Sequence, residues 1–143
     1  AMTTRKTVDQ YEAGEALEPY EFQVTPELNQ RYLDAVEDHH PRYVEGDDGD
    51  GPMVHPGFLL NQSNSTKSPS HALPEGVADI HAKDEVEFLA PGRVGKTFRV
   101  NWKMLEKYVK RERHYWVIEC VIVDEDGVAV LRKIATETFS RRR

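Results

Sequence analysis

Cysteine, long apolar runs and net positive charge are all scarce in this sequence of 143 residues. Its one cysteine, Cys120, excludes a disulfide framework and a cysteine-based metal site, and it fits a reducing, cytoplasmic environment. No segment approaches the roughly eighteen apolar residues of a membrane span, and the first residues lack the apolar core of a signal peptide. Acidic residues outnumber basic ones by 25 to 19. We therefore expect no membrane segment and no nucleic-acid partner.

What remains is a composition that fits one globular domain. Hydrophobic residues make up 38% of the chain and charged residues 31%. A chain of this length buries about two thirds of its unfolded surface, which is sufficient for a core. Internal repeats, low-complexity tracts and linkers are absent. We expect a single domain over residues 18–143, preceded by a polar arm, residues 1–17, that is extended or frayed.

The first predicted elements are a strand and a helix. Residues 18–25 alternate apolar and polar side chains, which is typical of a half-buried strand. A helix follows, because Thr25 can cap its free amides and Pro26 suits its first position. Its apolar side chains share one stripe that should face the core: Leu28, Tyr32, Leu33 and Val36. Pro41 limits this helix, since the residue before a proline is pushed out of helical geometry.

A polar loop separates this helix from a second one. Residues 45–52 are rich in glycine and aspartate and superficially resemble a calcium-binding loop, but they lack the glutamate at its twelfth position. We interpret them as a solvated loop. His55, Pro56 and Gly57 then lead into an apolar segment at Phe58, which reads as the start of a short buried helix.

The second half of the chain predicts antiparallel sheet. Four strand-like runs alternate apolar and polar residues, with turn signals such as Pro91-Gly92 and Asp126-Gly127 between them. The runs cover residues 78–89, 97–110, 114–123 and 128–140. Their lengths are near or above the upper end for ordinary strands, which indicates a curved sheet that wraps another element. The alternation favours hairpins with one buried face.

This order of elements resembles the hot-dog fold, and two segments narrow the resemblance to the MaoC-like dehydratases and hydratases. Residues 32–43, YLDAVEDHHPRY, are similar to the family segment Y-x-x-x-x-G-D-x-N-P-x-H. Residues 54–60, VHPGFLL, are similar to the A-H-G-M/F-L stretch at the start of the family's central helix. The resemblance covers residues 18–140. It implies an α+β hot-dog fold, in which a curved antiparallel sheet wraps around one central helix.

The match to the family's catalytic pair is incomplete. Asp38 stands at the position of the catalytic aspartate and Pro41 matches the family's proline, but His40 occupies the asparagine position and Glu37 the glycine position. Tyr43 takes the place of the catalytic histidine. In active members, the aspartate and histidine activate a water or move the α proton, and an amide at the helix start binds the thioester oxygen. Here one half of that pair is at its expected place.

Several residues are candidates for this chemistry. Asp38 could orient a water, or it could simply cap the turn before Pro41. Either His40 or His55 could replace the missing histidine, because histidine titrates near neutral pH. Tyr43 could donate a hydrogen bond to an oxyanion, or it could pack its ring beside the helix.

Substrate binding is expected at the start of the apolar helix. The Gly57 amide is a candidate donor to the thioester oxygen, with Pro56 and Phe58 beside it, although Pro56-Gly57 could instead only make a tight turn into the helix. A metal site built from His39, His40, His55 and Asp38 would have acceptable ligand types but no diagnostic spacing. We therefore expect no metal.

The resemblance implies a hydratase or dehydratase that acts on 3-hydroxyacyl or 2-enoyl thioesters of coenzyme A or an acyl carrier. The thioester would be part of the substrate, and no separate cofactor is expected. Two alternatives stay open: a non-catalytic hot-dog subunit that pairs with a catalytic partner, and a hot-dog thioesterase. A basic cluster could meet coenzyme A phosphates or could be a solvated hairpin tip: Lys107, Lys110, Arg111 and Arg113. We expect a homodimer or higher homo-oligomer, or a complex with another hot-dog subunit.

Overall fold

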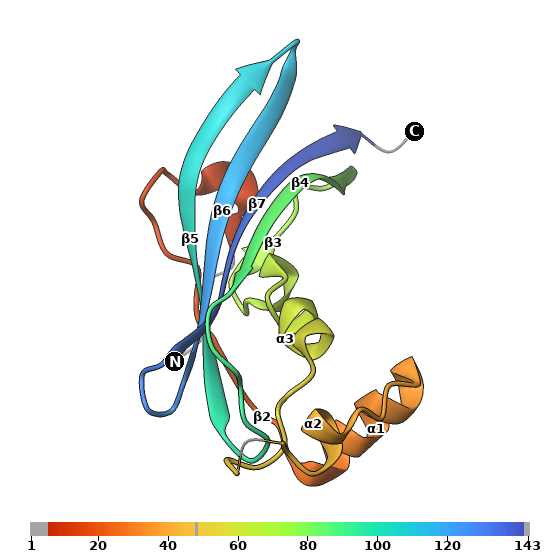
Figure 1. Ribbon diagram of the computed structural model, residues 1–143. Helices are drawn as coiled ribbons and strands as arrows, with labels where there is room; N and C mark the ends of the chain where they lie inside the picture. Colours follow the sequence, from red (N-terminus) through yellow and green to blue (C-terminus); the bar gives the residue numbers. More distant parts are fainter. Residues whose placement is uncertain (1–5, 48, 142–143) are drawn as a thin grey trace.

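The computed structural model describes residues 6–47 and 49–141. Its largest element is a five-stranded antiparallel sheet (Figure 1). The strand order is β2-β5-β6-β7-β4, and each neighbouring pair is antiparallel. The strands are β2 (Tyr20–Gln23), β4 (Val77–Phe88), β5 (Thr97–Lys110), β6 (Arg113–Asp124) and β7 (Ala129–Arg141). The four long strands predicted from alternation are confirmed. The prediction for residues 97–110 matches the observed bounds of β5.

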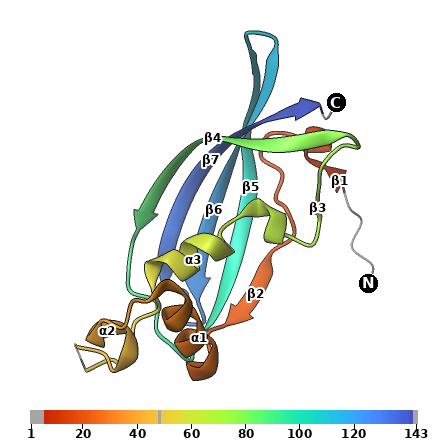
Figure 2. The ribbon, with the colours of Figure 1, turned by 90° about the vertical axis from the view of Figure 1, so that its right-hand side faces the viewer.

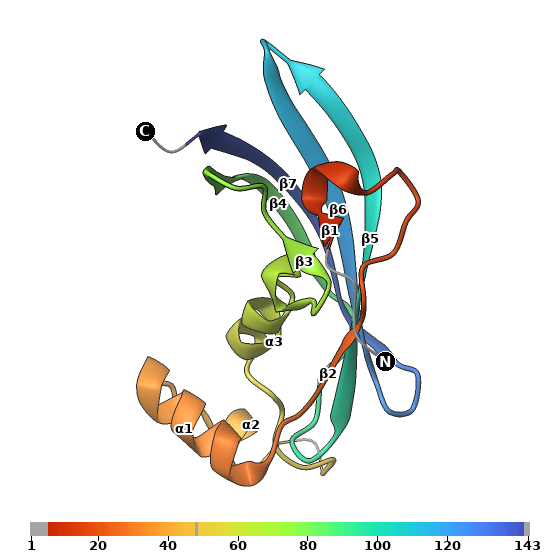
Figure 3. The same cartoon turned by 180° about the vertical axis from the view of Figure 1, so that it is seen from behind.

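The helices lie on one side of this curved sheet. They are α1 (Pro26–Val36), α2 (Pro41–Val44) and α3 (Pro56–Gln62), and a short 3-10 turn, η2 (Ser65–Lys67), follows α3. Figures 2 and 3 show α3 lying across the concave face, with α1 and α2 at one end of the sheet. The expected sheet wrapped around one central helix is confirmed. Within the described chain, each helix is too short or too polar to cross a membrane.

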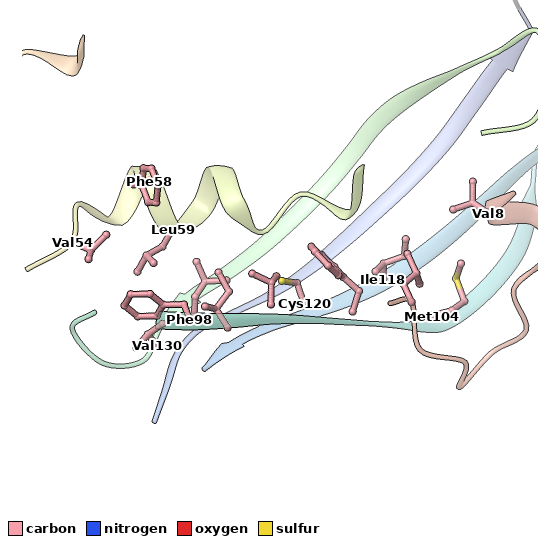
Figure 4. Packing of buried hydrophobic residues seen from close by; sticks show 14 of the residues in the cluster. Val8, Val54, Phe58, Leu59, Phe98, Met104, Ile118, Cys120 and Val130 are labelled. Atoms are coloured by element: carbon pink, nitrogen blue, oxygen red, sulfur yellow. The ribbon is translucent and has the colours of Figure 1, made fainter. Parts of the chain in front are cut away.

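Side chains of α3 and the sheet form the core. Along β6, every second residue is buried, including Trp116, Ile118 and Cys120, as its alternation predicts. Leu59 points from α3 toward the sheet, where Phe98 lies (Figure 4). Burial raises the pKa of the Cys120 thiol to about 12, so this side chain behaves as a small apolar group.

The first helix starts as its sequence predicts, but its apolar stripe is shorter. The Thr25 side chain accepts a hydrogen bond from the Leu28 amide at 3.2 Å, and Leu33 is fully buried. The last residue of the stripe, Val36, is 42% exposed, so its predicted place in the core is wrong. It ends α1 just before Glu37, whose left-handed backbone (φ 56°) turns the chain away.

The predicted polar arm is also corrected. From residue 6 onward it is packed onto the sheet: β1 (Lys6–Thr7) pairs with β3 (His71–Ala72), and a 3-10 turn, η1 (Val8–Gln10), follows β1. Three of its side chains belong to the core: Val8, Tyr11 and Leu17. They are too widely spaced to give a periodic signal. Residues 1–5 of this arm, Asp48 of the predicted acidic loop and residues 142–143 lie outside the described residues.

Two carboxyl groups, the buried Glu137 of β7 and the half-buried Asp79 of β4, lie near each other at the far end of the sheet from α1. Glu137 is only 2% exposed and accepts a hydrogen bond from Trp116 Nε1 at 3.1 Å. Burial, and then the neighbouring Asp79, raise the pKa of Glu137 to about 7. His81 also faces this carboxyl, 3.9 Å away, and His71 lies near Asp79. Between pH 4.5 and about 7, the Glu137 carboxyl therefore keeps a proton that an exposed glutamate would release.

We predict that Glu137→Gln flattens the dependence of stability on pH. Because the folded pKa, about 7, lies above the reference value of 4.5, stability from this group is full below pH 4.5 and is lost as pH rises through 7. The difference corresponds to roughly 3 kcal/mol at most. Glutamine keeps the acceptor for Trp116 and does not titrate.

Urea unfolding of both proteins between pH 4.5 and 8 measures this effect. The variant should be the more stable protein at pH 8, while Glu106→Gln, an exposed glutamate of β5, should follow the wild type. Parallel curves for Glu137→Gln and the wild type would contradict the prediction.

Candidate active site

Asp38 and His55 meet at the end of the molecule where α1 and α3 approach each other. Asp38 Oδ2 lies 3.1 Å from His55 Nε2, although 17 residues separate them in the chain. Their side chains are 42% and 21% exposed, so the pair is open to solvent on one side. The hydrogen bond from the His40 amide to Oδ1, and then His55, hold the pKa of Asp38 below its usual range. Asp38 is therefore an anion at neutral pH.

The left-handed backbone of Glu37 directs Asp38 toward His55. It ends α1, and the Asp38 amide then donates to the Leu33 carbonyl at 3.1 Å. Of the two roles weighed for Asp38, the structure shows the cap of the turn, and it also shows a contact with His55. Its Oδ1 caps the turn before Pro41 by accepting from the His40 amide, and its Oδ2 faces His55.

His55 caps α3 with its other ring nitrogen. Its Nδ1 accepts a hydrogen bond from the Gly57 amide at 2.9 Å, and Pro56 is the first residue of the helix. Because the Gly57 amide can only donate, Nδ1 carries no proton, and the proton of the neutral ring is on Nε2, directed at Asp38. One imidazole thus joins the carboxylate of Asp38 to the Gly57 amide, the first backbone N–H of α3.

The Gly57 amide is consequently not free in this structure. We predicted it as the donor to a thioester oxygen, and it can serve only when His55 Nδ1 gives up its hydrogen bond. Gly57 itself is required by space: a Cβ added here would lie 2.6 Å from Tyr32 Oη and 3.1 Å from His55 Nδ1. No larger residue fits without displacing one of these rings.

Two tyrosine rings flank His55. The ring centroid of Tyr43 lies 4.8 Å from that of His55, and the centroid of Tyr32 lies 5.4 Å from it on α1. Tyr43 is 8% exposed, and its backbone carbonyl accepts a hydrogen bond from Asn29, which ties α2 to α1. Tyr43 therefore packs its ring against His55 as a wall of the site.

The other two histidines of this region point elsewhere. His40 caps α2, and its Nδ1 accepts hydrogen bonds from the backbone and side-chain nitrogens of Arg42, each at 3.2 Å. His39 pairs with Asp34 at 2.7 Å. Among the histidines that the structure describes, His55 alone brings a ring nitrogen within hydrogen-bond distance of Asp38. No three of the described histidine, cysteine, aspartate and glutamate side chains are grouped closely enough to hold a metal ion.

An apolar cavity of about 270 Å³ borders the first turn of α3, although neither Asp38 nor His55 lines it. Residues of α3, the segment before it, and the end of β4 with the turn that follows line this cavity: Met53, Val54, Pro56, Leu59, Phe88, Leu89, Ala90, Pro91 and Gly92. Phe58, predicted beside the substrate, is instead buried against Phe22 and Tyr32, with ring centroids 5.9 and 5.3 Å away. Its side chain belongs to the core, since the first turn of α3 points it toward α1 and β2.

Sequence reasoning missed Tyr32 as a site residue. Its helical spacing from Leu28 and Val36 led us to assign it to the core, and its ring does pack on Phe58. Its hydroxyl, however, lies against Gly57 at the start of α3. The only available signal was that the similar segment in the MaoC-like family also begins with a tyrosine.

The basic cluster lies far from Asp38 within one chain. Lys107, Lys110, Arg111 and Arg113 surround the tip of the β5–β6 hairpin, whereas α1 and α2 lie at the opposite end of the sheet (Figure 1). Lys107 Nζ donates to the Asp9 carbonyl at 2.6 Å. The cluster of one chain therefore does not line that chain's own Asp38–His55 pair.

No protein-family model and no curated protein matches the sequence, so the similarity found is structural. The chain is similar to a monoamine oxidase regulatory protein from Archaeoglobus (TM-score 0.77, 16% identity, 98% of this chain and 99% of that one). It is also similar to the R-hydratase PhaJ1 from Pseudomonas aeruginosa (TM-score 0.75, 16% identity, 94% of this chain and 85% of that one). A MaoC-like dehydratase from Rhodospirillum rubrum matches with the same TM-score (0.75, 16% identity, 95% of this chain and 97% of that one).

Other structural matches extend the range of activities. They include the HadBC 3R-hydroxyacyl-ACP dehydratase complex from Mycobacterium tuberculosis (TM-score 0.66, 15% identity, 90% of this chain and 96% of that one). A thioesterase superfamily member from Thermus thermophilus is also among them (TM-score 0.59, 19% identity, 92% of this chain and 85% of that one). At these identities, the likeness establishes the fold. The chain has the hot-dog fold, and it resembles MaoC-like dehydratases and R-hydratases in structure.

Proposed function

We propose that this protein is a hydratase or dehydratase that interconverts 2-enoyl and 3-hydroxyacyl thioesters of coenzyme A or an acyl carrier. The observation that carries the proposal is the pairing of Asp38 with His55 at 3.1 Å, beside the first amide of α3. A carboxylate, a histidine and an amide donor are the groups that this reaction needs. With His55 in reach of Asp38, a catalytic role is favoured over that of a subunit without a working pair.

The reaction begins when the thioester oxygen takes the Gly57 amide as its donor. His55 Nδ1 then loses its hydrogen bond and becomes free to accept a proton, while Nε2–H stays on Asp38. Water adds its oxygen to C3 and gives a proton to Nδ1, and the electron pair of the double bond moves to the thioester oxygen as an enolate. The imidazolium, stabilised by ionised Asp38, returns that proton to C2. The net change is the addition of one water.

The apolar cavity beside Pro56 is the place for the acyl chain. It lies next to the helix start that would hold the thioester, and it is lined mainly by aliphatic side chains and Phe88. Burial of methylene groups there contributes about 0.8 kcal/mol each. The acid, the histidine and the amide would thus act on C2 and C3 while the chain beyond them is held in this cavity.

We predict that Asp38→Asn strongly slows hydration. Asparagine can keep the turn but presents an amide, which donates to His55 Nε2 and so reverses the tautomer of the ring. His55→Asn should be equally damaging, although asparagine remains a good helix cap and leaves α3 in place. Each change should reduce kcat by about 10²- to 10⁴-fold, the usual contribution of acid–base catalysis.

The assay is the loss of enoyl absorbance over a panel of enoyl thioesters. His39→Gln, at an exposed histidine paired with Asp34, should retain the wild-type rate. Product analysis separates a hydrated thioester from free acid plus thiol, which thioester hydrolysis would give. Full turnover by Asp38→Asn would remove the mechanism.

We also propose that two hot-dog subunits pair along β4. The edge of β5 is covered by β2 and by the N-terminal segment, which bridges at Ala16 and Lys103. The twelve residues of β4, in contrast, close the other edge of the sheet, and all of them are exposed or half-exposed. Such an edge is a template for a further strand. Antiparallel pairing would turn the second copy end for end, with its basic hairpin tip toward the end that carries Asp38.

This arrangement predicts a mass in solution of at least twice the 16.4 kDa of one chain. Two apolar residues of β4 are exposed: Ile80 has 39% of its surface accessible and Phe88 has 52%. The double variant Ile80→Lys/Phe88→Lys should shift the protein toward the monomer in light scattering. Val128→Lys, at an exposed valine in the β6–β7 turn, is the matched control and should not. A monomeric wild type, or one that binds only a different hot-dog chain, would count against self-pairing.

A further inference from the structure

Tyr32 presents an uncommitted hydroxyl at the start of α3. Its ring is fixed at both sides, edge-on to Phe58 with centroids 5.3 Å apart and tilted against His55 at 5.4 Å. The hydroxyl makes no hydrogen bond to another residue of the described chain. It lies so close to Gly57 that a Cβ at that residue would be 2.6 Å from Oη.

The chemical state of this hydroxyl suits a donor. Burial raises the pKa of Tyr32 above its ordinary value of 10, so the phenol keeps its proton throughout the neutral range. Tyr32 is half-buried, so a ligand oxygen can reach its hydroxyl and accept the hydrogen bond that this hydroxyl does not give to the described chain. The groups around it are the imidazole of His55, the amide of Gly57 and the ring of Phe58, none of which competes as an anion.

We propose that the Tyr32 hydroxyl is a catalytic hydrogen-bond donor to the thioester oxygen of the substrate. It would act together with the Gly57 amide, so this inference rests on the proposed function. The two donors are neighbours, one on α1 and one in the first turn of α3, since Oη lies against Gly57. Because the enolate formed during the reaction places its charge on this oxygen, both hydrogen bonds strengthen in the transition state.

Tyr32 also explains how the site can open. The Gly57 amide is held by His55 Nδ1 at 2.9 Å, so an arriving thioester finds this donor occupied. The Tyr32 hydroxyl is uncommitted and can take the oxygen first. The Gly57 amide can then exchange His55 for the same oxygen, which frees the base at the moment when the substrate is in place.

The test is Tyr32→Phe, which keeps the ring against Phe58 and removes only the donor. Loss of one oxyanion donor reduces kcat by about 10²- to 10³-fold, and we expect a fall of that order with KM changed only a few-fold. Tyr20→Phe, which makes the same chemical change on β2, should keep the wild-type kcat. Turnover by Tyr32→Phe within twofold of the wild type would overturn the proposal.

A binding measurement separates this inference from the proposed function. In the thioether that matches a coenzyme A thioester, a methylene group replaces the carbonyl and removes the acceptor oxygen, so the wild type should prefer the thioester. Tyr32→Phe should lose roughly tenfold of that preference, whether or not turnover is observed, since a hydrogen bond of this kind is worth a factor of about ten. If Asp38→Asn turns over normally while Tyr32→Phe loses the preference, the mechanism fails and the donor role stands. An unchanged preference overturns the donor role.

A stability cycle checks the geometry independently. Gly57→Ala should lower the unfolding midpoint, because the new methyl group would collide with Oη. Combined with Tyr32→Phe, which removes that oxygen, the loss should be partly restored; it should not be fully restored, because His55 Nδ1 still lies at 3.1 Å. Strictly additive effects of the two changes would show that Oη does not face Gly57, and would overturn the proposal.

Discussion

The anchoring of α3 at both ends is the interaction on which this molecule depends. The helix has only seven residues, too few to be stable alone, and it must lie at a fixed height over the concave face of the sheet. At its carboxyl end, the indole of Trp102 donates to the Ser63 carbonyl at 2.8 Å inside the core. At its amino end, His55 holds the Gly57 amide and reaches Asp38 beyond α1. The candidate active site is therefore one of two attachments of the central helix.

This double use of His55 links chemistry to architecture. A residue that caps a helix is normally satisfied and inert, whereas a base needs a free lone pair. His55 meets both requirements at different times if the substrate replaces it at the amide. Tyr43 and Tyr32 confine the imidazole between them and limit where it can turn.

Sequence patterns predicted the frame of the molecule and only part of the site. Strand alternation located β4 to β7, and the Thr25-Pro26 pair located the start of α1, because these signals are local. The choice between His40 and His55 was not local: it depends on the left-handed turn at Glu37, which sends Asp38 toward a residue 17 positions away. The packing of Val8, Tyr11 and Leu17 was missed for a similar reason, since their partners lie on distant strands. The core packing of the Tyr32 ring was predicted from helical periodicity, but the position of its hydroxyl was not, because periodicity carries no information about the hydroxyl group.

The contact between Tyr32 and Gly57 has a consequence for how this sequence can vary over evolution. The hydroxyl of one residue occupies the volume that a side chain of the other would need. A lineage can acquire a side chain at residue 57 only after the tyrosine has lost its oxygen or moved, and until then a glycine is compulsory. The two positions, 25 residues apart, are thus coupled in one direction: relatives with a side chain at residue 57 should lack the tyrosine, whereas relatives that have lost the tyrosine can keep the glycine.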